Sequence, residues 1–290
     1  IELITNPSAK YNPEGMSGMI NFVLKKNMQD CFNGSYNGNV TFAKVPKFNQ
    51  GVDLNYRKGK VNFFGNYNYS DQKTLNGGVM TQLDDNSQQI FDIVNDNKVH
   101  TFKVGFDIYA NDKNTFSLYT NQTYADGIGT VDNTISYPSS PLLLQTDQYE
   151  GANKSQIYNA AYKKLFAKAG QTLDFEVNYS KTNDDQNGNF GIAGNSPTNY
   201  NDNSNNTVDA VQANLDYVHP FNEKTKLEVG AEYRTTTIDN TYRTTNIIGN
   251  QTDFEYKMDI ASAYATFGSK FDKWGYQIGA RLEKYNVEAD

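Results

Sequence analysis

The sequence has 290 residues, of which 37% are hydrophobic and 13% aromatic, with 21 Tyr and 17 Phe but one Trp. This aromatic content argues against a disordered chain, because disordered chains are poor in aromatic residues. The formal net charge of -7 and the scattered Lys and Arg give no support to nucleic-acid binding, and the single cysteine, Cys31, argues against a disulfide framework or a cysteine metal site.

Two short apolar runs open the chain. The first, residues 1–4, ends at the sequence NPS (6–8), which is typical of a turn. The second, residues 19–24, follows Gly15 and Gly18, which allow a close backbone approach or a positive φ. We therefore predict a small two-strand unit at the start, followed by a segment of another kind.

From residue 31 onward, apolar and polar residues alternate. In HTFKVGFDIYA, for example, Phe102, Val104 and Phe106 fall on one face, and Lys103 and Asp107 fall on the other. A period of two indicates a β-strand with one apolar face, whereas a helix would space such residues three and four apart. The pattern predicts about eleven strands, at 31–43, 48–57, 61–72, 98–110, 115–126, 154–166, 172–183, 207–219, 225–238, 254–269 and 274–287.

The predicted connections alternate in length. Short turns such as RKGK and NDKN alternate with long polar segments at 73–97, 127–153, 184–206 and 239–253. Outer-membrane barrels sort their connections in this way, with tight turns at the periplasmic end and long loops outside. No apolar run approaches the roughly 18 residues of a membrane helix, but a barrel strand needs only about 9–11. The sequence predicts an all-β, transmembrane, antiparallel up-and-down β-barrel, with a soluble β-rich binding module as the alternative.

Some aromatic residues lie near the ends of predicted strands, as the aromatic girdle of a barrel requires. They are Tyr67, Tyr69, Trp274 and Tyr285. His100 and His219 also lie at strand ends, without the spacing of metal ligands, so we expect both to be interfacial side chains. The sequence contains no catalytic motif that we recognise, and we predict neither an enzyme nor a cofactor site.

The long polar segment at 184–206 holds the candidate ligand residues. Its sequence places Phe190 and Tyr200 among amide and hydroxyl groups, so that each ring can stack on a polar ligand. The adjoining NDDQNG is similar to the start of an EF-hand loop, and its would-be ligands are Asn183, Asp185 and Asn187. The twelfth position is Gly194 instead of the Glu that supplies the bidentate ligand, so we predict a solvated extracellular loop and keep these residues as an incomplete calcium candidate.

The opening stretch IELITNPSAKYNPEGMSGMINFVLKKN closely resembles the end of the plug domain of TonB-dependent outer-membrane receptors, above all in the Bacteroidota outer-membrane β-barrel protein family. The resemblance covers about 26 residues. We interpret its motif as shaping the plug and not as binding a ligand; the motif residues are Asn6, Pro7, Ser8, Tyr11, Glu14, Gly15, Gly18 and Asn21. The resemblance implies that residues 1–27 end a plug domain. Residues 28–290 would then form the N-terminal half of a barrel, about 11 strands of an expected 22, with the remainder expected beyond Asp290.

The resemblance also implies a function and partners. Such receptors take up scarce nutrients, for instance a siderophore, a glycan or a peptide, through a multi-pass barrel that contacts the lipid of the bacterial outer membrane. The TonB–ExbB–ExbD complex would supply energy through a segment outside this sequence, and a surface lipoprotein is a candidate partner. The alternative is a non-transporting outer-membrane barrel with a structural or secretion-associated role.

Overall fold

The computed structural model describes residues 2–4, 9–10, 19–21, 30–138, 140–193, 198–246 and 251–290. Within these ranges all regular secondary structure is β-strand, and no helix there is long and apolar enough to cross a membrane. β1 (Glu2–Ile4) and β2 (Met19–Asn21) form a short antiparallel pair. The remaining strands form one separate sheet.

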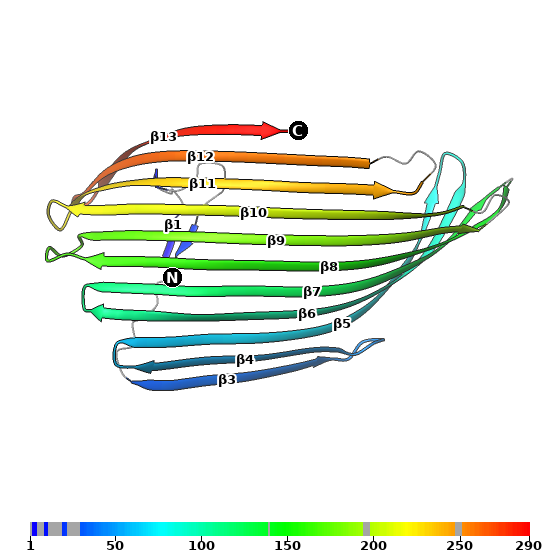
Figure 1. Ribbon diagram of the computed structural model, residues 1–290, viewed down its shortest axis with the longest axis horizontal. Coiled ribbons are helices and arrows are strands. Elements are labelled where there is room, and N and C mark those ends of the chain that lie inside the picture. The colour runs from blue at the N-terminus through cyan, green and yellow to red at the C-terminus, as the bar shows by residue number, and fades with distance from the viewer. Residues whose placement is uncertain are drawn as a thin grey trace.

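The large sheet has eleven strands in sequence order, each antiparallel to its neighbours. Figure 1 shows them side by side in a curved layer, with β3 at one edge and β13 at the other. The all-β, up-and-down antiparallel fold predicted from the sequence is therefore confirmed. The strands are β3 (Cys31–Thr41), β4 (Lys47–Lys58), β5 (Val61–Gln82), β6 (Ser87–Asn111), β7 (Asn114–Tyr137), β8 (Ser140–Leu165), β9 (Thr172–Ala193), β10 (Thr198–Pro220), β11 (Thr225–Thr244), β12 (Gln251–Lys270) and β13 (Gly275–Ala289).

Most described residues of the polar segments that the sequence predicts as long loops lie in strands instead. β5 and β6 continue through most of 73–97 and pair without a register shift up to Gln82 and Ser87. These hairpins carry polar residues on both faces, so hydropathy does not alternate there, yet their backbone N–H and C=O groups still pair across the strands. β8 reaches 26 residues, far more than the about 9–11 that cross a membrane. In Figure 1 the long ends of β5–β10 extend past the ends of β3 and β4.

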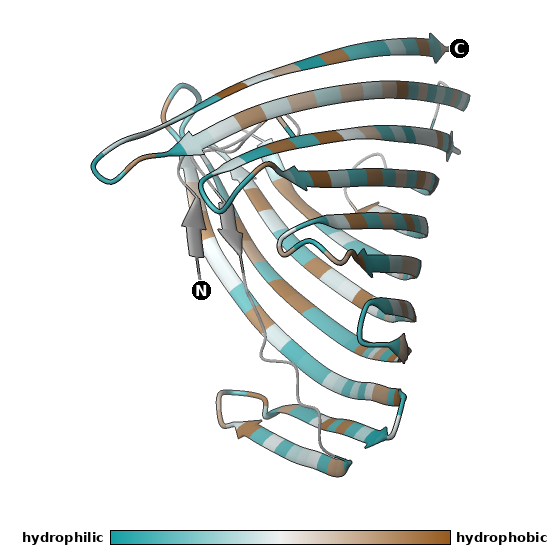
Figure 2. Cartoon of the chain, turned by 90° about the vertical axis from the view of Figure 1, so that its left-hand side faces the viewer, coloured by the Kyte–Doolittle hydropathy of each residue, from teal (hydrophilic) through white to brown (hydrophobic). Residues whose placement is uncertain are grey.

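The two faces of the sheet differ in character, and Figure 2 shows hydrophobic and hydrophilic residues alternating along the strands. One face, named here the outer face, carries a band of exposed apolar side chains; Phe106, Leu118 and Leu215 are 44%, 51% and 44% exposed. The opposite face is named the inner face. In the described ranges the only buried hydrophobic residues are Ile260 and Tyr264. The described residues thus form almost no buried core, while many apolar side chains of the outer face are exposed. This combination is expected of a sheet whose outer face contacts lipid.

Aromatic residues mark both ends of the apolar band on the outer face. Towards the long hairpins, the His100 ring contacts the Tyr69 ring, and its Nδ1 lies 2.8 Å from the Tyr67 hydroxyl. Beyond His100, charged residues appear on the same face among exposed apolar ones such as Ile128, beginning with the paired residues Lys98 and Asp126. The interfacial positions predicted for Tyr67, Tyr69 and His100 agree with this arrangement.

At the tight-turn end of the band, Trp274 stacks on Phe271 at 4.3 Å between ring centroids, and the His219 ring meets Phe221 edge-on. Both predicted interfacial residues of this end, Trp274 and His219, therefore lie among aromatic rings. The assignment of Tyr285 to the girdle is wrong, because this residue pairs with Ile260 on the inner face.

Candidate functional site

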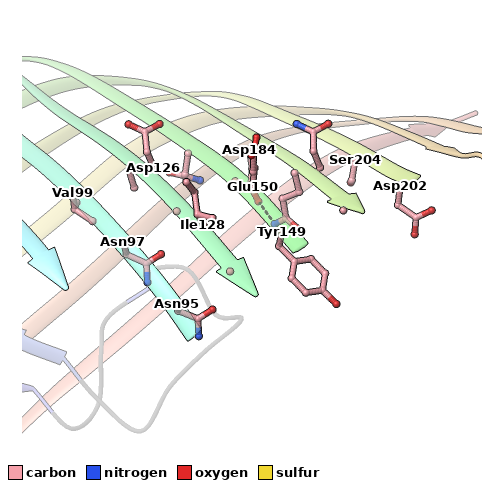
Figure 3. Close-up of a pocket in the computed structure, with 18 of the residues that line it drawn as sticks. Asn95, Asn97, Val99, Asp126, Ile128, Tyr149, Glu150, Asp184, Asp202 and Ser204 are labelled. Atoms are coloured by element: carbon pink, nitrogen blue, oxygen red, sulfur yellow. Dashed lines mark hydrogen bonds between the residues drawn. The ribbon is translucent and has the colours of Figure 1, made fainter. Parts of the chain in front are cut away.

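A hollow of about 880 Å³ lies on the inner face, in the part of the sheet that extends beyond the apolar band. Seven strands, β5 to β11, contribute residues to its lining. Figure 3 shows Asn95, Asn97 and Tyr149 extending from one side of the sheet into this space, whereas Asp126 extends from the other side. The hollow exists because the long hairpins continue as one curved sheet, so that side chains distant in sequence share a concave surface.

Two aromatic rings line one wall of the hollow, and a third stacks behind them. Phe190 in β9 pairs with Tyr200 in β10, and their rings stack at 4.6 Å with an interplanar angle of 9°. Tyr149 in β8 meets Phe190 edge-on at 5.6 Å. All three lie beyond the apolar band, and loss of solvation raises the pKa of the Tyr149 and Tyr200 hydroxyls above the ordinary value. Both phenols are therefore neutral near pH 7 and can donate hydrogen bonds.

Glycines form the floor of the hollow in front of these rings. Gly127, Gly129, Gly151 and Gly188 all lie on the inner face of the central strands. A Cβ atom at Gly188 would lie 2.7 Å from the Phe190 ring, and one at Gly127 would lie 2.5 Å from the Asn97 amide oxygen. The absence of a side chain at these positions thus lets the neighbouring ring and amide lie over the backbone.

The polar groups of the hollow are amides and carboxylates. Asp202 accepts a hydrogen bond of 2.8 Å from the Tyr242 hydroxyl, and Asp184 accepts one of 3.2 Å from Gln186. No Lys, Arg or His occurs among the described residues that line this space. The hollow therefore presents hydrogen-bonding groups and negative charge beside an aromatic wall.

The structure brings both predicted ligand residues, Phe190 and Tyr200, to this site, but on strands and not in a loop. Phe190 lines the hollow, and Tyr200 supports it from behind. Sequence reasoning missed Tyr149, which lies on β8 about 40 residues before Phe190. The sequence feature that could have identified Tyr149 is its spacing of two and four residues from Gly151 and Asn153, which places all three on the inner face.

The incomplete calcium candidate lies elsewhere. Asn183, Asp185 and Asn187 are successive outer-face positions of β9, so the predicted loop is wrong. An extended strand points these side chains along a line and cannot wrap them around an ion as an EF-hand turn does. The amide of Asn203 donates to Asn187, and that of Asn205 donates to Asp185. Within the described ranges, no cluster of three or more His, Cys, Asp or Glu could hold a metal ion.

Most residues of the predicted plug motif lie outside the described residues, namely Asn6, Pro7, Ser8, Tyr11, Glu14, Gly15 and Gly18. Asn21 ends β2, where its backbone pairs with Glu2. Ala9 and Lys10 are described, and both lie against the inner face of the large sheet. The Lys10 ammonium pairs with Asp216 at 2.8 Å, and the Lys10 carbonyl accepts a hydrogen bond of 3.1 Å from Arg281.

A chain of ion pairs on the inner face surrounds this contact. Arg281 binds Glu232 at 2.9 Å and Glu283 at 2.6 Å, and its side chain is only 7% exposed. Arg234 lies 3.0 Å from Glu232, and the Tyr264 hydroxyl donates to Asp216. The inner wall of β10–β13 thus contacts the described residue Lys10 through charged and polar groups.

Comparison with known proteins gives one family match. Residues 164–290 match the model of the outer membrane protein beta-barrel family, and a search of curated protein sequences finds no match. Among solved structures, the Ralstonia pickettii toluene transporter TbuX is similar at 8% identity, with 90% of each chain covered and a TM-score of 0.33. The Pseudomonas putida toluene transporter TodX is similar at 9% identity, with 90% of this chain and 87% of the TodX chain covered and a TM-score of 0.33. TM-scores this low give no information about the ligand of this chain.

The family match covers the end of β8 and all of β9–β13. Together with the antiparallel sheet and the exposed apolar band of its outer face, the match places the chain in the outer membrane as a multi-pass β-barrel protein. The soluble β-rich module, which the sequence left open, is thereby excluded.

Proposed function

We propose that this chain is part of a TonB-dependent receptor, which takes up a scarce nutrient across the outer membrane with energy from the TonB–ExbB–ExbD complex. The observation that carries the proposal is the contact of Lys10 with Asp216 and Arg281 on the inner face. Lys10 belongs to the stretch that resembles the end of a plug domain, and a plug lies against the inner wall of its barrel. Under this proposal residues 1–27 end the plug, and the barrel wall begins at residue 28.

The character of these contacts supports a plug that can move. The Lys10 and Asp216 side chains are 35% and 15% exposed, so the pair is partly hydrated. Partly hydrated ion pairs contribute only about 0–1 kcal/mol each. Where the described residues show the contact, at Ala9 and Lys10, it is made largely by such polar groups, so that this segment can leave the wall under the modest force of an energy-coupling protein.

The open edges of the sheet indicate a larger barrel. β3 and β13 each pair with one neighbour only among the described strands. In lipid, an unpaired backbone group costs several kcal/mol. We therefore propose that further strands pair with both edges, in a barrel of about 22 strands whose plug and extracellular hollow lie on one transport route.

Growth on single nutrient sources tests the proposal whatever the chemical class of the ligand. Deletion of the gene should abolish growth on at least one source when that source is scarce, and deletion of TonB should abolish growth on the same source. Restoring the gene in cells that lack TonB should not restore growth. Growth that needs this protein but is unchanged without TonB would overturn energised uptake and favour a non-transporting outer-membrane role.

A further inference from the structure

We infer that the hollow binds a neutral saccharide, with a sugar ring stacked on the Tyr149–Phe190 wall and its hydroxyls held by side-chain amides and carboxylates. The inference rests on the proposed function, since it names the class of ligand that such a receptor would take up. It adds a site and a chemistry that the fold and the family match leave open.

The aromatic wall is built to present a ring to a ligand. Tyr149 remains 39% exposed at the hollow, while the Phe190 ring supports it edge-on and Tyr200 stacks behind Phe190. This backing fixes the position of the exposed ring before any ligand arrives. The face of an aromatic ring carries partial negative charge and attracts polarised hydrogens. The C–H face of a pyranose offers such hydrogens, so a sugar ring can stack there.

The charge of the hollow selects against anions. Asp184 and Asp202 face this space, and the described lining residues include no Lys, Arg or His. A phosphate, carboxylate or catecholate ligand would meet like charge and find no charged donor, which disfavours its binding. Neutral and cationic ligands remain.

The amide groups favour a neutral ligand over a cationic one. Asn95, Asn97, Asn153 and Gln72 line the hollow, and each side-chain amide offers a donor as well as an acceptor. A hydroxyl group also donates and accepts, so a polyhydroxylated ligand can use both functions of every amide. An ammonium group has donors only and would leave the amide donors without a partner.

The size and floor of the hollow fit more than one sugar unit. Its volume of about 880 Å³ lies in the upper part of the range of about 300–1,000 Å³ that is usual for ligand sites. The floor lets a ring approach the backbone closely at Gly151, where the nearest atom to a built Cβ would be the Asp185 carbonyl oxygen at 3.8 Å. We therefore expect an oligosaccharide to occupy this site.

Isothermal titration of the purified full-length protein in detergent micelles tests the inference with hexasaccharides of equal length and different charge. Neutral probes are maltohexaose, cellohexaose and the N-acetylglucosamine hexamer; the glucosamine hexamer is cationic, and the galacturonate hexamer is anionic. At least one neutral probe should bind, with an affinity at least tenfold higher than that of the anionic probe. Binding of no neutral probe, or equal binding of the galacturonate hexamer, would overturn the inference, as would binding of the cationic probe alone.

Variants locate the site. Tyr149→Ala should weaken binding of the neutral probe at least tenfold, and Tyr149→Phe should largely preserve it. Phe254→Ala is the matched control, because Phe254 is a 43% exposed inner-face ring that does not line the hollow. Heat-dependent gel mobility shows that each variant is folded. If Tyr149→Ala and Phe254→Ala behave alike, the inferred site is wrong. This binding assay does not involve TonB, so its failure and the failure of energised uptake are distinguishable.

Discussion

At the scale of single residues, the inner wall depends on one arginine. Arg281 is 7% exposed and connects two carboxylates, Glu232 and Glu283, to the backbone carbonyl of Lys10. Its guanidinium supplies several donors in a fixed plane, a geometry that a lysine cannot reproduce. Without this cation, two partly buried carboxylates on β11 and β13 would face each other across β12 with no common partner.

Arg281→Ala should therefore lower the free energy of unfolding by about 3 kcal/mol, because removing one member of a buried ion pair leaves uncompensated charge. Urea unfolding in micelles, followed by intrinsic fluorescence, measures this change. Lys224→Ala is the control, since the Lys224–Asp272 pair is 61% and 90% exposed and should contribute less than about 1 kcal/mol. Equal effects of the two substitutions would show that the Arg281 network does not stabilise the wall.

At the scale of elements, each long strand has two parts with different surroundings. On β7 the outer-face residue Leu118 lies within the apolar band, whereas Ile128 lies on the same face beyond the boundary marked by His100. Both side chains are more than half exposed, at 51% and 59%. Exposure alone does not distinguish them, but only Leu118 lies where lipid would surround it.

An arginine introduced at each of these two positions should show which position lies in lipid and which lies in water. Leu118→Arg should destabilise the folded protein by about 2–4 kcal/mol, as charged residues do near the membrane midplane, whereas Ile128→Arg should cost about 0–1 kcal/mol. Unfolding in lipid vesicles measures both variants. A similar loss at both positions would mean that the membrane boundary does not lie between them.

The same division explains what the sequence could predict. In the band, alternation of residues such as Phe102 and Lys103 reveals each strand, its face and the antiparallel order. In the hairpins, both faces contact water, so residues 127–135 show no alternation although β7 continues through them. For the same reason the sequence predicted only part of the site. Its composition identified Phe190 and Tyr200. The contact of Tyr149 with Phe190 depends on the register of β8 on β9, which pairs Tyr149 with Gly188.

At the scale of the whole molecule, the inner face has two distinct polar regions. The hollow lies at the long-hairpin end, and the ion pairs that hold Lys10 lie on β10–β13, nearer the tight turns. This second region contains a small space of about 420 Å³, lined in part by Lys10, Asp216, Glu232 and Arg234. In the proposed receptor, ligand would bind at the first region, and the plug would leave the wall at the second.

Charge exchange at the second region tests this picture. In a Cys31→Ser background, an Ala9→Cys thiol should be only partly accessible, because Ala9 is half-buried against Gly279 on the inner wall. Lys10→Asp should speed maleimide labelling several-fold, since the ion pair becomes a repulsive contact with Asp216. Adding Asp216→Lys should slow the labelling again. The labelling rate should not return fully to its original value, because Asp216 also accepts a hydrogen bond from the Tyr264 hydroxyl. A labelling rate that is the same in all three proteins would show that Lys10 does not hold this segment to the barrel.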